Sequence, residues 1–83
     1  DFLAQVISYD KKSKTATIEQ RNYFKVGDIV NLFGPNNVDI DFKIEKIETP
    51  DGISVEVANH PKEILKINVP FEVSKDFMIR VKI

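Results

Sequence analysis

Apolar and polar residues alternate with a period of two along most of the chain. The clearest run is Val38-Asp39-Ile40-Asp41-Phe42-Lys43-Ile44-Glu45. A period of two places the apolar side chains on one face of a β-strand, whereas a helix would scatter them around its circumference. The next apolar residue after Ile44 is Ile47, so the spacing slips by one. The slip predicts a β-bulge near Glu45 and Lys46, which would bend the strand around a barrel corner.

Six further segments show strand-like patterns, so the chain is expected to form seven short strands. These segments are residues 3–9, 15–21, 28–33, 53–57, 65–69 and 77–83. From the same alternation we expect seven side chains to face the core: Ile29, Ile40, Phe42, Ile44, Val55, Ile67 and Ile79. Only residues 61–66 could form a helical turn, and the segment is too short for a full helix.

The segments between the expected strands have turn chemistry. They are Asp10-Lys11-Lys12-Ser13-Lys14, Gly34-Pro35-Asn36-Asn37, Pro50-Asp51-Gly52 and Asn59-His60-Pro61. Strands at this spacing predict a sandwich or a barrel, and closure into a barrel removes exposed strand edges. We therefore expect residues 1–83 to form one all-β domain, a small closed barrel of six or seven strands with no helix longer than two turns.

Composition narrows the functional classes. The 83 residues contain no cysteine, which excludes a thiolate nucleophile, a cysteine-ligated zinc site and a self-contained iron–sulfur cluster, and favours a reducing compartment such as the cytoplasm. No apolar run approaches the ~18 residues of a membrane span, so we expect no membrane partner. The net charge of −1 gives no overall attraction to nucleic acid. The chain begins at Asp1 rather than Met, and we expect it to be a piece of a longer polypeptide.

Two stretches carry a resemblance to a known family. They are Asn22-Tyr23-Phe24-Lys25-Val26-Gly27-Asp28-Ile29-Val30-Asn31-Leu32-Phe33-Gly34-Pro35, and Val57-Ala58-Asn59-His60-Pro61 followed by Ile64-Leu65-Lys66-Ile67. They resemble the C-terminal domain of the collagenase-like peptidases, peptidase family U32, and the similarity extends over essentially the whole chain. Lys75 and Ile79 depart from the family pattern, which has Gly and Leu there, and the departure concerns the geometry of one turn.

The segment Lys25-Val26-Gly27-Asp28 also resembles the second domain of elongation factor Tu, a small β-barrel found in translation factors. Gly27 permits a tight backbone turn, and Asp28 can cap that turn so that the next strand enters at a fixed angle.

The resemblance implies an accessory role. Proteins of the family are described as proteases (hydrolases), and some are implicated in hydroxylation of transfer or ribosomal RNA, with the chemistry in a larger upstream domain. The chain would then be the non-catalytic C-terminal domain of a larger protein, binding or positioning a peptide substrate or partner for the upstream catalytic domain of the same chain. The alternatives are a purely structural or oligomerisation barrel, and a weak RNA-binding module of an RNA-modifying member. We expect no catalytic residue, metal or cofactor, because no nucleophile–base pair can be assembled from these residues.

Basic residues in the first third of the chain are the candidate binding site. They are Lys11, Lys12, Lys14, Arg21 and Lys25, with Tyr9, Tyr23 and Phe24 nearby in sequence. Basic side chains interleaved with aromatic ones are typical of single-stranded nucleic-acid binding. The alternative is a lysine-rich hairpin tip that keeps the domain soluble, with core aromatics.

Three other features have a structural interpretation beside a functional one. His60 could be a base or ligand, but a turn histidine bonded to backbone is favoured because no partner set is evident. Asp39 and Asp41 have a spacing that would suit paired glycosidase carboxylates, but they share a strand face with Lys43, which indicates a solvated surface. Phe33 could be an exposed contact residue or could plug one end of the barrel.

Overall fold

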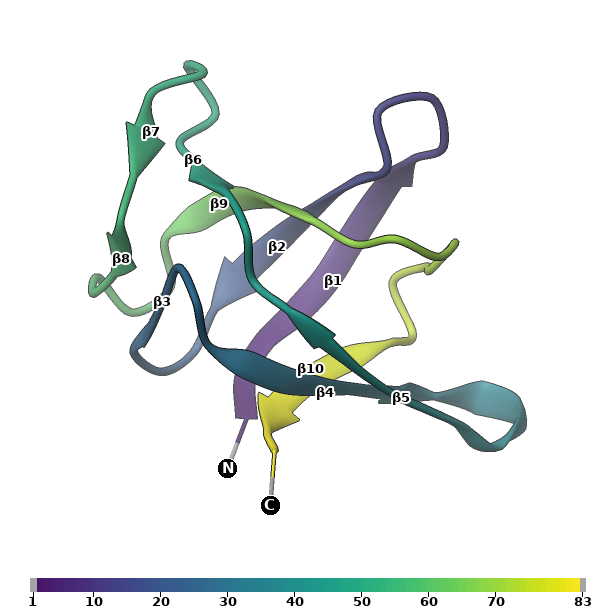
Figure 1. Ribbon diagram of the computed structural model, residues 1–83. Helices are drawn as coiled ribbons and strands as arrows, with labels where there is room; N and C mark the ends of the chain where they lie inside the picture. Colours follow the sequence, from purple (N-terminus) through teal and green to yellow (C-terminus); the bar gives the residue numbers. More distant parts are fainter. Residues whose placement is uncertain (1, 83) are drawn as a thin grey trace.

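Ten β-strands and one 3₁₀ turn make up the regular structure within residues 2–82, which are the residues that this computed structural model describes (Figure 1). The strands are β1 (Phe2–Asp10), β2 (Thr15–Gln20), β3 (Phe24–Lys25), β4 (Ile29–Gly34), β5 (Val38–Lys43), β6 (Ile47–Glu48), β7 (Ser54–Val55), β8 (Val57–Ala58), β9 (Ile64–Asn68) and β10 (Met78–Val81). The 3₁₀ turn is η1 (Pro35–Asn37). The prediction of an all-β domain is confirmed for these residues, and no helix in them is long and apolar enough to cross a membrane.

Eight of the strands form one antiparallel sheet, and it curls around a common core (Figure 1). The order of its strands is β5-β4-β10-β1-β2-β9-β6-β7, while β3 and β8 pair separately. Two backbone hydrogen bonds next to the β3–β8 pair join the segment after β3 to both ends of the sheet. Val26 N donates to the carbonyl of Glu56, which follows β7 (2.9 Å), and Gly27 N donates to the carbonyl of Ile44, which follows β5 (2.7 Å). No ladder within residues 2–82 joins β5 to β7, so closure into a barrel stays a prediction.

Side chains from most strands of the sheet fill the core. Its buried apolar members are Leu3, Ala4, Val6, Ala16, Ile18, Phe24, Val30, Leu32, Phe42, Ile44, Ile47, Ala58, Leu65, Ile67, Val69, Val73 and Ile79. Four of the seven side chains expected in the core are therefore buried: Phe42, Ile44, Ile67 and Ile79. Val55 is half-buried and packs against the core.

Two of the expected core residues are exposed, and those predictions are wrong. Ile29 is 48% exposed because its neighbour Val30 takes the inward position at the start of β4. Ile40 is 39% exposed although its cross-strand partner Leu32 is buried. β5 is an end strand of the sheet, so Ile40 is covered from one side only.

The corner at residues 44–46 is a strand break rather than the expected bulge. β5 pairs with β4 and ends at Lys43, whereas β6 begins at Ile47 and pairs with β7 and β9. The Asn68 side chain binds the backbone at this break: its Oδ1 accepts hydrogen bonds from the backbone N–H groups of Glu45 and Lys46, both at 2.9 Å. The slip in the apolar spacing therefore marks the place where the chain changes its strand partners.

Candidate functional site

The basic residues expected to form one binding site lie in two separate places. Lys11, Lys12 and Lys14 occupy the loop between β1 and β2, whereas Arg21 follows the opposite end of β2. A six-residue strand spans roughly 20 Å, so Arg21 is far from the loop. Lys25 lies in β3, also away from the loop (Figure 1). The structure therefore brings together only the three loop lysines.

Carboxylates neutralise part of this positive charge. Lys11 Nζ lies 3.2 Å from a Glu72 carboxylate oxygen, and Arg21 Nε lies 3.4 Å from Glu19. Lys25 Nζ lies 2.7 Å from Asp28, and the hydrogen bond between them raises the pKa of the lysine and lowers that of the carboxyl. Within residues 2–82, Lys12 and Lys14 form no ion pair, so two of the three loop lysines keep their charge free, as do Lys43, Lys62, Lys66 and Lys75 elsewhere in the domain.

The aromatic residues near these lysines in sequence do not interleave with them in space. Tyr9 is half-buried, and its hydroxyl donates to the Val69 carbonyl at 2.6 Å. Phe24 is buried in the core. Tyr23 is 56% exposed but lies after β2, away from the loop. Stacking of bases between loop lysines and these rings is therefore not available.

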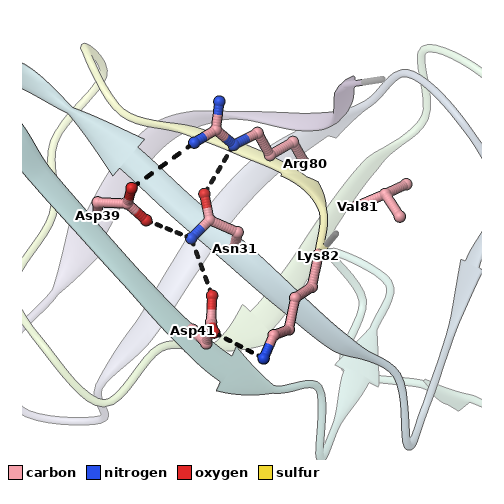
Figure 2. Close-up of a pocket in the computed structure, with 6 residues that line it drawn as sticks. All are labelled: Asn31, Asp39, Asp41, Arg80, Val81 and Lys82. Carbon is pink, nitrogen blue, oxygen red and sulfur yellow. Dashed lines mark hydrogen bonds and ion pairs between the residues drawn. The ribbon is translucent and has the colours of Figure 1, made fainter.

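A second cluster, which the sequence did not predict as a site, covers the outer face of β5, β4 and β10 (Figure 2). Its centre is Asn31, which is only 7% exposed. Asn31 Nδ2 donates to one carboxylate oxygen of Asp39 (2.6 Å) and one of Asp41 (2.9 Å), and Arg80 Nε donates to Asn31 Oδ1 (2.7 Å). Lys82 Nζ lies 3.0 Å from Asp41. We call these five residues the Asn31 network.

The Asn31 network is charge-balanced and stacked on aromatic rings. Two carboxylates face two cations, and the Arg80 guanidinium also lies 3.8 Å from Asp39. Hydrogen bonds from Asn31 and then Lys82 lower the pKa of the Asp41 carboxyl. The Arg80 guanidinium carbon sits 4.2 Å from the centre of the Phe33 ring, and Phe33 stacks on Phe2 at 5.9 Å between centroids. The outward-facing carboxylates are thus fixed in structural bonds rather than held as a catalytic pair.

Phe33 therefore lies on the outer face of the sheet and does not plug an end of a barrel. A polar residue inside the apolar run of β4 was the available signal for the network: Asn31 interrupts Ile29, Val30 and Leu32. Asn31 also shares its cross-strand row with Asp41 and Arg80, and such a row depends on strand register, which the sequence alone does not give.

His60 lies in an exposed turn before β9. Its backbone N–H donates to Gln20 Oε1 (3.3 Å), and its carbonyl accepts from Glu63 N (3.1 Å). This agrees with the structural interpretation of a turn residue. Within residues 2–82, no group of three or more histidine and carboxylate side chains is placed to hold a metal ion.

Comparison with known proteins identifies the family. The family model described as the peptidase family U32 C-terminal domain matches residues 1–80, and the chain belongs to this family. Among solved structures, the C-terminal domain of a Geobacillus thermoleovorans U32 protein is similar over 100% of this chain and 93% of that one, with 36% identity and a TM-score of 0.94. Its selenomethionine variant matches with 38% identity over 96% of this chain and 98% of that one, at a TM-score of 0.91.

A curated relative is tRNA hydroxylation protein P1 of Bacillus subtilis, which is 36% identical over 80 residues. The match covers 96% of this chain and 19% of the relative, so the chain spans about a fifth of that protein's length.

Proposed function

We propose that this domain is the non-catalytic C-terminal module of a tRNA-hydroxylating U32 protein, and that it contacts the tRNA weakly through the lysine loop, Lys11, Lys12 and Lys14. The observation that carries the proposal is the 36% identity, over 96% of the chain, to a protein named for tRNA hydroxylation. That name favours an RNA-modifying parent over one that cleaves peptides. A tRNA partner also implies a cytoplasmic location.

The lysine loop suits a weak phosphate contact. Its three lysines fall within four positions at the tip of a hairpin, and two of them have no carboxylate partner within residues 2–82. Exposed lysines act as point charges for phosphate oxygens and carry no sequence information. Because the whole domain has a net charge of −1, long-range attraction is absent and only local contacts contribute. The loop would thus add affinity to a complex whose specificity and chemistry lie elsewhere in the protein.

A titration of the isolated domain with tRNA at two salt concentrations tests the proposal. The isolated domain is a suitable sample because the Geobacillus relative was crystallised as a C-terminal domain that this chain matches over 93% of its length. If about three phosphates are neutralised, log K should fall with log salt at a slope of roughly −2 to −3. The Lys11→Gln/Lys12→Gln/Lys14→Gln variant should lose this binding and keep the fold.

A control variant removes three exposed lysines from other parts of the domain, one of them ion-paired as Lys11 is: Lys46→Gln/Lys62→Gln/Lys75→Gln. It should bind tRNA as the unmodified domain does. Equal weakening by the loop variant and the control, or no binding even at low salt, would contradict the loop contact. The purely structural or oligomerisation role would then be the better account of the domain.

A further inference from the structure

An open groove of about 230 Å³ lies beside the start of β1. Its floor is formed by Leu3 and Val30, which are buried, and the Asp28 carboxylate also lines it. The apolar residues of its rim are Tyr23, Ile29 and Val81. These three are among the eight large hydrophobic side chains found exposed within residues 2–82, with exposed fractions of 56%, 48% and 46%. Isolated exposed apolar side chains are ordinary, but a cluster around a hollow is typical of a contact surface.

The groove continues into the Asn31 network. Val81 lines both hollows, so the apolar groove and the polar cluster share a border. The exposed Phe2 ring stacks on Phe33, and the Arg80 guanidinium of that cluster lies over the Phe33 ring. Protein interfaces have this composition: an apolar centre, aromatic and arginine anchors, and a polar, solvent-accessible rim.

Charge around the groove disfavours RNA as its occupant. Three of the nearby cations are each held by a carboxylate: Lys25 by Asp28, Lys82 by Asp41, and Arg80 by Asp39. Lys43, the ladder partner of Ile29, forms no ion pair within residues 2–82. Phosphate groups approaching this surface would meet three carboxylates and a single unpaired cation, Lys43. A protein surface with a protruding apolar side chain meets no such penalty.

We infer that this groove is the surface on which the domain docks against the preceding part of its own polypeptide. The inference rests on the proposed function to the extent that both place the domain in a longer protein. In the Bacillus relative the matched region is 19% of the protein, and the family description places it at the C-terminal end. The preceding chain would therefore enter at β1, whose residue Leu3 lies in the groove floor. That entry point holds the upstream part close to the groove at a high effective concentration.

The docking surface and the lysine loop lie at opposite ends of the β1–β2 hairpin (Figure 1). Docking through the groove would therefore leave the loop open toward a bound tRNA. The two proposals are compatible, and each can fail without the other.

The test uses the full-length protein that carries this domain, with a protease site inserted ahead of the domain. After cleavage, analytical ultracentrifugation measures whether the two parts remain associated, and titration of the labelled domain gives the Kd. We expect the unmodified parts to stay together and Ile29→Arg to raise the Kd at least about tenfold, as loss of an interface anchor does. Tyr23 lies outside the sheet, so Tyr23→Ala should leave the strands intact. It should also raise the Kd, which would show that the effect of Ile29→Arg does not come from misfolding.

The matched control is Ile53→Arg, since Ile53 is 61% exposed in the β6–β7 turn, away from the groove. It should leave the Kd unchanged within about twofold. Dissociation of the unmodified parts after cleavage, or equal weakening by Ile29→Arg and Ile53→Arg, would overturn the proposal. So would a dimer of the isolated domain that Ile29→Arg abolishes, because the occupant would then be a second copy. Loss of tRNA binding in Tyr23→Ala with association intact would assign the groove to RNA instead.

Discussion

Gln20 is the most constrained polar side chain within residues 2–82. It is fully buried, and its Nε2 donates to the carbonyls of Ala58 (2.6 Å) and Asn22 (3.1 Å) while its Oε1 accepts from His60 N. The amide thus joins the end of β2 to the turns before β3 and β9. Its position continues the inward alternation of Ala16 and Ile18, so the sequence indicated where it points but not what it binds.

Replacing this amide should cost substantial stability. We expect Gln20→Leu to lower the free energy of unfolding by at least about 2 kcal/mol, because each buried group left unpaired costs roughly 1–3 kcal/mol. Urea denaturation followed by circular dichroism measures the change. Gln5→Leu is the matched control, since the one side-chain hydrogen bond of Gln5 within residues 2–82 is with the exposed Arg21 side chain. A loss as small as that of the control would mean that water replaces the three bonds of Gln20.

Asp41 should contribute to stability at neutral pH and not in acid. Its pKa is lowered in the folded state by Asn31 and Lys82. The unfolded chain therefore binds the proton first as the pH falls below about 4, the ordinary value for Asp. The stabilisation is present above that value and is lost as the pH falls through the folded-state pKa. The free energy of unfolding, measured by denaturant melts from pH 6 to pH 2.5, should fall less steeply with decreasing pH for Asp41→Asn than for the unmodified domain. Asp51→Asn, in an exposed turn, should follow the unmodified curve, and a parallel fall of all three would contradict the role of Asp41.

The turn after β4 has a packing requirement as well as a conformational one. Asn36 and Asn37 have positive φ values of 64° and 62°, as turn asparagines can. Gly34 has an extended backbone that any residue can adopt, so this position does not need glycine for its conformation. A Cβ on Gly34 would lie 2.5 Å from the Phe77 ring. The missing side chain therefore makes room for that ring.

We expect Gly34→Ala to destabilise the domain by roughly 1–3 kcal/mol, the usual cost of overpacking. Combining it with Phe77→Leu should recover part of the loss, because the smaller side chain can move away. Thermal melts of the two single variants and the double variant give the coupling. Additive losses in the double variant would show that the loss in Gly34→Ala does not come from contact with the Phe77 ring.

The elements with a clear period were predictable from the sequence. Of the two-residue strands, only β7 and β8 overlap an expected segment, residues 53–57, which was expected to be one strand. Each of the seven expected strand segments contains an observed strand, because alternation over four or more residues leaves one choice of face. The two-residue strands β3 and β6 have no period to detect. The candidate site was predicted less well, because Asn31, Asp39 and Arg80 meet only through cross-strand register. Lys11 and Arg21 are near in sequence, but an extended strand separates them.

For the molecule as a whole, a small core makes single aromatic contacts important. Phe42 is 7% exposed and meets Phe71 edge-to-face at 5.7 Å. We expect Phe42→Ala to cost roughly 3–5 kcal/mol, a large share of the 5–15 kcal/mol typical of a folded domain. Chemical denaturation measures the loss, and Tyr23→Ala should cost far less because its ring is exposed. A change below about 1 kcal/mol for Phe42→Ala would mean that the core collapses around the gap.

The place of β10 in the sheet has a consequence for how the domain is made. This strand lies between β1 and β4 and pairs with both, so the β4–β5 hairpin joins the large sheet only through it. Phe2 and Arg80 are ladder partners although nearly the whole domain separates them along the chain. A chain emerging from the ribosome cannot complete this sheet until its last strand has been released. Until then β1 and β4 each keep an unpaired strand edge, and folding follows the slow regime of proteins dominated by distant contacts.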